Sequence, residues 1–419
     1  MKVLKVSFIV LAAALITFGL SGMALAFHSG GVAECMGCHN IHDASSTSAL
    51  LSHTDASSTC LECHGHSGAS SYHIATPDAD MPAGSPPYNR TPGGDFGWLK
   101  KTYAWVPRTG AAEEVSPGTR KGHNIVAVDF GYAADDNNAT APGGTMDASV
   151  FSCTSCHDQH GKLRRLSDGT FATTGAPIIG SGSYNNSADP AAGQAVGVYR
   201  ILRGTGSDAG PGGVTFGTNA IFHAVAPSTY NRTEATTPTR VAYGAGISDW
   251  CAACHPDMHS GTSSKMTHPV NQGLSATVVA NYEKYLGSGN MTGTAATSYD
   301  SIVPFQTGNS QDYTALKALA VNNGSVSTGP ATSDRVNCLS CHRSHASGFD
   351  YMTRWNATGS EFIAVDGVWP GTDSPSTIAN QAKYAQGRTV AETTKAYNDT
   401  TMHYATYQRS LCNKCHAKD

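Results

Sequence analysis

The sequence predicts a mostly irregular chain with short α-helices and few strands, rather than a layered domain built on its own apolar core. Val, Ile, Leu and Phe make up only about 14% of residues 27–419, below the roughly 20% expected of chains that fold around their own side chains. Glycine (45) and proline (19) are abundant, and polar stretches such as residues 180–194 separate the few apolar segments. Something other than aliphatic side chains must therefore provide the interior.

The first 26 residues are predicted to be a signal peptide, and residues 27–419 a single unit. Two lysines precede an apolar run over residues 6–20, and Ala-Leu-Ala stands before Phe27 as a cleavage site. A membrane anchor is the alternative, which the lack of a second apolar run of spanning length disfavours. We therefore expect an exported protein with no membrane span.

The charge balance excludes one class of partner. The whole chain has a formal net charge of −4, which becomes −6 when Lys2 and Lys5 are removed with the signal peptide. A nucleic-acid-binding protein would favour a basic face instead. We therefore expect no nucleic acid partner.

All twelve cysteines fall into six copies of the pattern Cys-x-x-Cys-His, numbered here as motifs one to six. The pattern is the attachment signature of c-type haem, in which two thiols add to one porphyrin and the adjacent histidine binds the iron. Disulfides need no such histidine, and zinc would need two pairs to converge on one ion. The predicted thioether and proximal ligands are Cys35, Cys38 and His39; Cys60, Cys63 and His64; Cys153, Cys156 and His157; Cys251, Cys254 and His255; Cys338, Cys341 and His342; Cys412, Cys415 and His416.

Six covalently bound haem c groups would supply the missing interior, because each macrocycle is a large apolar body. The predicted fold class is therefore irregular coil with short helices and few strands, wrapped around a stack of six haems, as in a multihaem cytochrome. We expect short helices at the attachment motifs. Apolar spacing predicts further helices over residues 276–286, 312–320 and 391–411.

Each iron needs a second axial ligand, and twelve histidines lie outside the motifs. Methionine competes for this role, but histidine pairs are favoured because nothing resembles the loop around a methionine ligand. His66 and His259 stay open as alternatives, and so does His28, while His53, His223 and His403 are treated as ordinary residues. The predicted distal ligands are His42, His73, His123, His160, His268 and His345.

His42, His160 and His345 share one position, three residues after a proximal histidine. On a helix such a residue lies one turn away, on the same side of the macrocycle as the proximal ligand. It cannot reach the opposite face of that ring. We therefore expect these three histidines to serve other haems, and a hydrogen bond to a haem propionate is the alternative for each.

Several longer stretches resemble a known family. They are FHSGGVAEC at Phe27, TPGGDFGWLKKTYAW at Thr91, RKGHNIVA at Arg120, APSTYNRTEATT at Ala226, NCLSCHRSHASGFD at Asn337 and the C-terminal YQRSLCNKCHAKD. Across the mature chain they resemble the OmcS-like hexahaem cytochromes, which lie on the outer surface of metal-reducing bacteria and polymerise into conducting filaments. The segment between motifs one and two is shorter here than the family pattern.

The resemblance implies a loop-rich fold with six haems, each bound by two histidines, in a continuous stack of alternating parallel and T-shaped pairs. It also implies that one haem takes its second ligand from the neighbouring subunit, with His42 in the donor position. A cell-surface or extracellular location follows, with partner cytochromes and extracellular acceptors such as ferric oxides. Spacing by itself shows only that His42 serves some other haem.

Three functions are compatible with these features. Electron transfer along a filament, without chemistry on a small molecule, is favoured because two-histidine ligation leaves no open iron position. A discrete soluble shuttle shares every haem feature and differs only in where His42 binds. A multihaem reductase would need one vacant or lysine-ligated iron, whereas all six motifs end in histidine. The chain is therefore not expected to be an enzyme.

Overall fold

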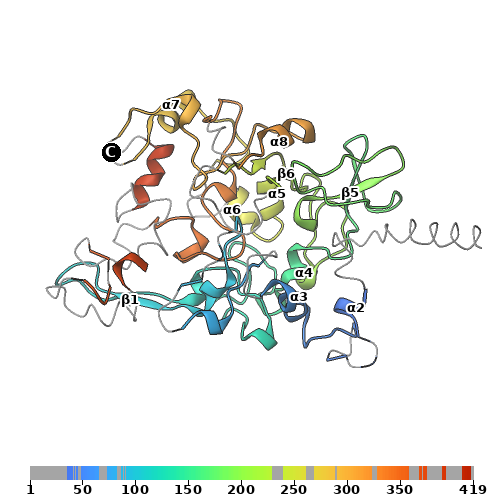
Figure 1. Ribbon diagram of the computed structural model, residues 1–419, viewed down its shortest axis with the longest axis horizontal. Helices are drawn as coiled ribbons and strands as arrows, with labels where there is room; N and C mark the ends of the chain where they lie inside the picture. The colour runs from blue at the N-terminus through green and yellow to red at the C-terminus, as the bar shows by residue number, and fades with distance from the viewer. Residues whose placement is uncertain are drawn as a thin grey trace, which may run out of the picture.

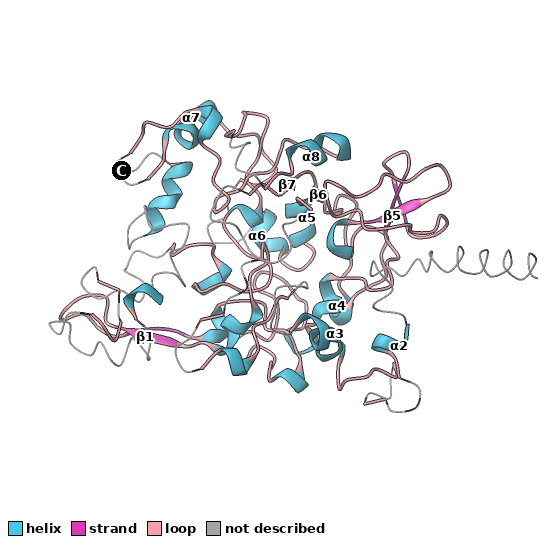
Figure 2. Cartoon of the chain, viewed as in Figure 1, coloured by secondary structure: helices cyan, strands magenta, loops and turns pink. Residues whose placement is uncertain are grey.

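The structure is a computed structural model, which describes residues 35–40, 42, 44–45, 49–65, 73–82, 86–87, 89, 91–228, 239–260, 269–287, 290–322, 328–357, 368–369, 371–374, 389–392 and 408–416. Irregular segments dominate these residues, and short helices and small sheets are scattered along them (Figures 1 and 2). The predicted fold class is confirmed. Within these ranges every helix is too short or too polar to cross a lipid bilayer.

The α-helices are short, and four of them begin, contain or end at attachment cysteines. Helix α3 starts where the Asp55 carboxylate accepts a hydrogen bond from the Ser58 amide, which satisfies a free N–H of the first turn. Gly65 follows its last residue, and the Gly65 amide donates to the Leu61 carbonyl. The α-helices are α2 (Cys35–Cys38), α3 (Ala56–His64), α4 (Cys153–Cys156), α5 (Ile247–Cys251), α6 (Pro256–Ser260), α7 (Ala276–Lys284) and α8 (Tyr313–Leu319).

Short stretches of 3-10 helix connect many of the irregular segments, and two of those described contain attachment cysteines. They are η1 (Asp78–Asp80), η2 (Phe96–Lys100), η3 (Gly118–Arg120), η4 (Val128–Phe130), η5 (Ala148–Val150), η6 (Tyr199–Ile201), η7 (Pro211–Gly213), η8 (Ala295–Thr297), η9 (Cys338–Ser340), η10 (Asp350–Met352) and η12 (Gln408–Lys414).

Within the described part of the chain, the strands form three small antiparallel sheets. Strand β1 pairs with β2 with Ala104 opposite Val115, β6 pairs with β7 with Val225 opposite Ala242, and β3 lies between β4 and β5. The strands are β1 (Tyr103–Trp105), β2 (Glu114–Ser116), β3 (Arg164–Leu166), β4 (Phe171–Ala172), β5 (Ala195–Gly197), β6 (Ala224–Val225) and β7 (Ala242–Tyr243).

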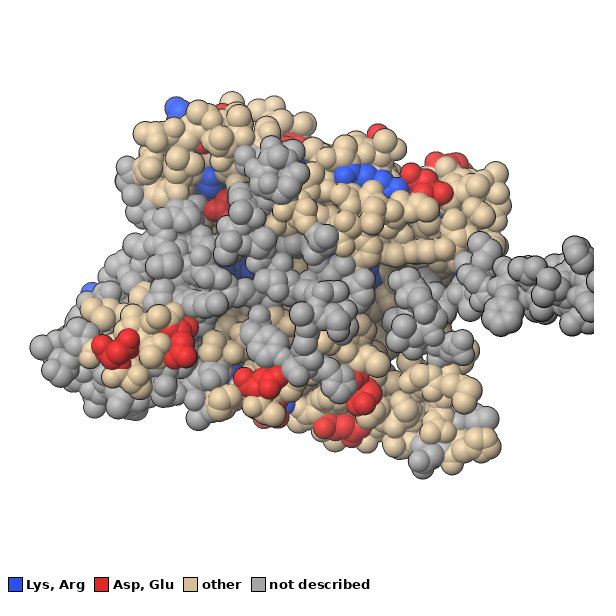
Figure 3. Space-filling view, viewed as in Figure 1, with Lys and Arg blue, Asp and Glu red and all other residues tan. Residues whose placement is uncertain are grey.

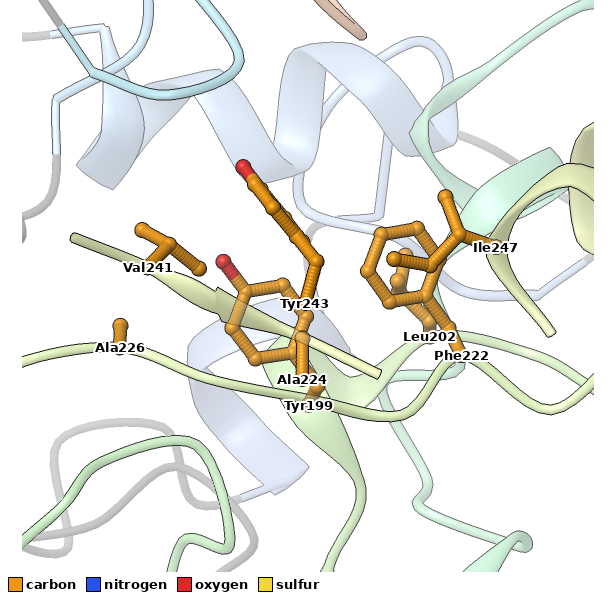
Figure 4. Close-up of a cluster of buried hydrophobic side chains, with 8 residues drawn as sticks. All are labelled: Tyr199, Leu202, Phe222, Ala224, Ala226, Val241, Tyr243 and Ile247. Atoms are coloured by element: carbon orange, nitrogen blue, oxygen red, sulfur yellow. The ribbon is translucent and has the colours of Figure 1, made fainter. Parts of the chain in front are cut away.

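Among the described residues, buried apolar side chains form five separate clusters, rich in aromatic residues, and three of them pack against attachment cysteines. The cluster in Figure 4 contains Phe222, Tyr243 and Ile247, and Cys156 packs against it. A second cluster packs against Cys341 and Cys415. A core divided in this way agrees with the low content of aliphatic residues, because each cluster is small and three of the clusters lie beside attachment cysteines.

Two of the three helices predicted outside the motifs are confirmed. Helix α7 covers Ala276–Lys284 of the expected 276–286, and α8 covers Tyr313–Leu319 of the expected 312–320, with Asp312 as its N-cap. For the third, residues 390–392 are helical and η12 begins at Gln408, while residues 393–407 lie outside the described residues.

Among the described residues on the face shown in Figure 3, no extended basic area is visible. Among the described residues there, acidic side chains lie in several separate groups and only a few basic side chains are visible. The picture agrees with the formal negative charge of the chain.

Candidate haem-binding site

The attachment cysteines lie side by side in the order of their motifs. The Cys60 and Cys153 thiols share a hydrogen bond, which raises the pKa of Cys60 and lowers that of Cys153. A second such bond joins Cys251 to Cys338, lowering the pKa of Cys338 to about 7. These two contacts place motif two beside motif three, and motif four beside motif five, each through the first cysteine.

The remaining neighbouring motifs interact electrostatically through the second cysteine of each motif. Burial and then the nearby Cys63 thiol raise the pKa of Cys38. Burial and then Cys254 raise the pKa of Cys156, and burial and then Cys415 raise the pKa of Cys341 to about 12. Motifs one to six therefore form one linear series, and none of the twelve thiols is engaged in a disulfide.

The predicted proximal histidines of motifs one, three and five are held in the same way. The backbone of each histidine forms an isolated antiparallel bridge with a later residue, and the ring Nδ1 donates to the carbonyl two residues before that bridge. This fixes the tautomer and points Nε2 away from the backbone, as a metal ligand requires. The Nδ1–oxygen pairs are His39 with Ala49 at 2.7 Å, His157 with Arg200 at 2.8 Å and His342 with Tyr351 at 2.8 Å.

A left-handed turn presents each of these carbonyls. Leu50, Ile201 and Met352 each lie just before a bridge residue, with φ of 52°, 50° and 58°. Non-glycine residues adopt this conformation rarely and at some energetic cost. The same strained turn at three places indicates that orienting the histidine ring is its purpose.

Two further rings are anchored on backbone carbonyls. His255 Nδ1 lies 2.8 Å from the Pro142 oxygen, and His123 Nδ1 lies 2.7 Å from the Ser344 oxygen. His64 and His416 also make contacts within the fold.

Three predicted proximal histidines face three predicted distal histidines. An iron bound by two imidazole nitrogens at about 2 Å each would hold the ring centroids roughly 6 Å apart. The structure places three pairs of rings at this separation. They are His39 with His160 at 6.4 Å, His255 with His123 at 6.1 Å and His157 with His345 at 6.3 Å between centroids.

The histidines three residues after a motif do not continue a helix, contrary to our expectation. His157, at the end of α4, has extended backbone angles of φ −104° and ψ 142°. The Asp158 carboxylate then accepts from the His160 amide at 3.1 Å, and the Asn40 side chain accepts from the His42 amide at the same distance. The same local turn, favoured by Asp and Asn, therefore carries His42 and His160.

The other predicted distal ligands are placed as follows. His42 is exposed, and His73 is buried at 3% exposure. The Ile74 amide donates to the His64 carbonyl, so the chain around His73 returns to motif two. His268 lies outside the described residues, as do the alternatives His28 and His66.

The histidines treated as ordinary or in reserve make polar or aromatic contacts. His259 Nε2 lies 3.1 Å from Asn271 Nδ2 and 3.4 Å from Asp249 Oδ1. His53 lies between Asp129 and Glu62. His223 is buried, with its Nδ1 2.9 Å from the Ile221 oxygen. His403 lies outside the described residues.

The electrostatics of the paired rings fit iron ligation. Burial lowers the pKa of His123 and His157 to about 4 and that of His345 to about 3, so these imidazoles stay neutral near pH 7 and keep a lone pair for a metal. Buried donors beside motif five, Asn337 Nδ2 and Trp355 Nε1, also lack a partner. They would suit an acceptor such as a haem propionate.

Sequence reasoning missed the groups that orient the rings. The carbonyls of Ala49, Arg200 and Tyr351 belong to the backbone, which every residue carries, so no residue type marks them. The nearest sequence signal is an arginine two residues after the strained turn in motifs three and five, at Arg203 and Arg354.

The chain is similar to known proteins along its whole length. No protein-family model matches the chain. The chain is 51% identical over 440 residues to C-type cytochrome OmcS of Geobacter sulfurreducens, with 100% of both chains covered. It is similar to a cryo-EM structure of OmcS nanowires from that bacterium, with 49% identity and TM-score 0.78, covering 94% of this chain and 100% of that one. It is also similar to an Outer Membrane Cytochrome S filament from the same bacterium, with the same identity and coverage and TM-score 0.79.

Proposed function

Because the chain belongs to the family of the C-type cytochrome OmcS, we propose that it transfers electrons along a filament of identical subunits through six covalently bound haem c groups. Haem c supplies a one-electron couple between ferric and ferrous iron. The observation that carries the proposal is the set of three facing histidine pairs, at 6.1 to 6.4 Å between ring centroids.

Two-histidine ligation favours electron transfer over catalysis, because it leaves no iron position open to a substrate. The carbonyl-anchored rings of His157 and His255 are suited to hold a low-spin iron and exclude water from it. A multihaem reductase would need an open iron, and no motif lacks its histidine.

A repeated displacement supports the assembly of subunits. His160, after motif three, faces the proximal ligand of motif one, and His345, after motif five, faces that of motif three. Each donor therefore serves the haem two motifs earlier. By the same pattern, the iron held by His342 of motif five needs a donor from two motifs later. That position is motif one of the next subunit.

His42 occupies that donor position in motif one. It follows His39 as His160 follows His157, the same kind of turn carries it, and it is exposed. We assign it to the haem held at His342 of an adjacent subunit. A discrete shuttle would instead use His42 within its own chain.

The even-numbered motifs follow a similar displacement. His123 lies between motifs two and three and faces His255 of motif four. By the same displacement His268, between motifs four and five, is assigned to His416 of motif six. His73 is assigned to the iron held by His64 of motif two. His28 is the alternative ligand for that iron, because it precedes motif one as His123 precedes motif three.

The proposed location is the outer surface of an exporting cell, after removal of residues 1–26 as a signal peptide. Electrons would arrive from partner cytochromes and leave to extracellular acceptors such as ferric oxides. We assign residues 27–419 to one unit, because the six motifs between residues 35 and 416 follow one another as neighbours in a single series.

Carbon monoxide binding to the purified, reduced holoprotein tests this function against the enzyme alternative. We expect only low-spin spectra, no carbon monoxide adduct and no turnover of nitrite or hydroxylamine. A carbon monoxide adduct on about one sixth of the haem, together with turnover, would overturn the proposal. Electron microscopy of the same sample separates the filament, which we expect, from the discrete shuttle.

A further inference from the structure

Asp95 is a fully buried carboxylate between two segments that carry predicted distal ligands. It is 0% exposed, and it begins η2 by accepting a hydrogen bond from the Gly97 amide at 2.7 Å. A buried carboxylate is costly unless hydrogen bonds satisfy it, so the groups that donate to Asp95 are held firmly in place. Its side chain binds the segment that follows His73, and its backbone binds the segment that contains His345.

The side-chain contacts of Asp95 fix the chain three residues after His73. Asp95 Oδ1 accepts from the Thr76 amide at 2.9 Å, and Oδ2 accepts from the Thr76 hydroxyl at 2.6 Å. Oδ2 also accepts from Asn89 Nδ2 at 2.8 Å and from the Asn89 amide at 3.1 Å. With the bond from Gly97, each carboxylate oxygen therefore accepts at least one backbone amide.

The backbone on either side of Asp95 lies against His345. The Asp95 amide donates to the Ala346 carbonyl at 3.2 Å, and the His345 amide donates to the Gly93 carbonyl at 2.7 Å. The Phe96 ring then stacks on the His345 ring, with 4.8 Å between centroids and 25° between planes. A carboxylate that holds this stretch in place therefore also sets Phe96 against His345.

The two histidines belong to neighbouring motifs. His345 faces His157 of motif three, and His73 is assigned to the iron of motif two. The first cysteines of these motifs, Cys60 and Cys153, share a hydrogen bond. Asp95 therefore stands between the distal ligands of two haems that are adjacent in the proposed series.

We propose that Asp95 is a positioning residue for two haems at once, which orients His73 through Thr76 and His345 through Phe96. Contacts that orient a ligating imidazole also tune the metal that it binds, so a change at Asp95 should alter both irons together. The inference rests on the proposed function for the presence of haem and for the role of His73. It goes beyond that function in naming one residue that sets the ligand geometry of two adjacent irons.

Paramagnetic resonance of the oxidised, full-length holoprotein tests the proposal with Asp95→Asn. In either orientation the new side chain turns an NH₂ group toward a backbone amide, because both carboxylate oxygens accept one. We expect changed low-spin g values on about one third of the haem, with all six haems still attached. Asp334→Asn is the matched control, because the buried Asp334 accepts the Gly308 and Ala331 amides, in segments without a predicted ligand.

Milder variants separate the two arms of the proposal. Thr76→Val removes the hydroxyl and should change about one sixth of the haem, whereas Thr76→Ser should resemble the wild type. In a His73→Ala background, Thr76→Val should add no further change, because it acts through His73. Phe96→Leu removes the stacked ring and should change the same haem that loses its distal ligand in His345→Ala.

The outcomes separate positioning from a general role in folding. Wild-type g values in Asp95→Asn would overturn the proposal, and so would equal changes in Asp95→Asn and Asp334→Asn. If Asp95→Asn does not fold, an unchanged spectrum in either Thr76→Val or Phe96→Leu overturns the proposal, and a change on about one sixth of the haem in each supports it. Fewer than six low-spin haems in the wild type would instead contradict the proposed function.

Discussion

The imidazole rings of His39 and His160 face each other at 6.4 Å with only 8° between their planes. His39 belongs to motif one and His160 follows motif three. The fold therefore brings together two histidines that are far apart in sequence. The Ala49 carbonyl anchors the His39 ring, and the turn at Asp158 positions His160. The pair is the simplest unit of the proposed ligation, and it leads directly to the first prediction.

His160→Ala should leave one iron with a single histidine ligand while all six haems stay attached, because no thioether is changed. We expect a high-spin signal and carbon monoxide binding on about one sixth of the haem, measured by paramagnetic resonance and optical spectra. His259→Ala is the control, since His259 already contacts Asn271 and Asp249. The assignment is wrong if His259→Ala shows the high-spin fraction and His160→Ala does not.

Gly93→Ala should disturb the haem of motif three through His345. An added Cβ at Gly93 would lie 2.6 Å from His345 Nδ1, so the ring must shift, at a cost of about 1–3 kcal/mol. We expect altered low-spin g values for one haem and a lower melting temperature. At Gly217 an added Cβ meets nothing within 4 Å, so Gly217→Ala should resemble the wild type. If Gly93→Ala and Gly217→Ala both give the wild-type resonance spectrum, Gly93 does not pack closely against the His345 ring.

Asp189→Asn should weaken the contact between the β3 sheet and α8 in a pH-dependent manner. The Asp189 carboxylate accepts from Lys317 Nζ at 2.7 Å and from Arg165 Nη2 at 3.3 Å, and the bond from Lys317 is the main cause of its lowered pKa. A lowered folded-state pKa gives stability that is present above the unfolded value of about 3.9 and is lost as pH falls through the folded value.

The difference in the free energy of unfolding between wild type and Asp189→Asn should therefore be largest near pH 7 and vanish near pH 2. Because Asp189 is 62% exposed, we expect at most about 1 kcal/mol. Thermal unfolding of the holoprotein at several pH values measures it, with the exposed Asp136→Asn as control. A difference that grows toward acid pH would contradict the assigned sign.

Removal of haem should unfold the chain. The mature sequence has about 14% Val, Ile, Leu and Phe, and its buried side chains form small separate clusters, of which three pack on attachment cysteines. Protein produced without haem attachment should be rapidly degraded by protease and lack a cooperative melt. A compact, protease-resistant apoprotein would show that the polypeptide supplies its own core.

Local chemistry explains what the sequence could predict. The haem attachment pattern Cys-x-x-Cys-His consists of five consecutive residues. All six proximal histidines could therefore be predicted without a structure. Helices α7 and α8 were predictable because their apolar spacing and their caps, Ser275 and Asp312, are also local. The irregular fold class followed from composition.

The pairing of histidines could not be predicted, because it depends on contacts between distant segments. Nothing near His123 in sequence marks His255 as its partner. The expectation that His160 follows His157 by one helical turn was wrong, since the chain leaves the helix at His157. Its consequence, that His160 faces a ring of another motif, agrees with the geometry. No residue type marks the backbone carbonyls that anchor the histidine rings, and His268 lies outside the described residues.

Counting subunits and low-spin irons in His42→Ala tests the central claim most directly. We expect all six haems to remain attached, one iron in six to become high-spin, and negative-stain images to show single subunits in place of filaments. His160→Ala, which loses a ligand inside the subunit, should still form filaments. Long filaments of His42→Ala protein with six low-spin haems would contradict the proposed coupling between subunits.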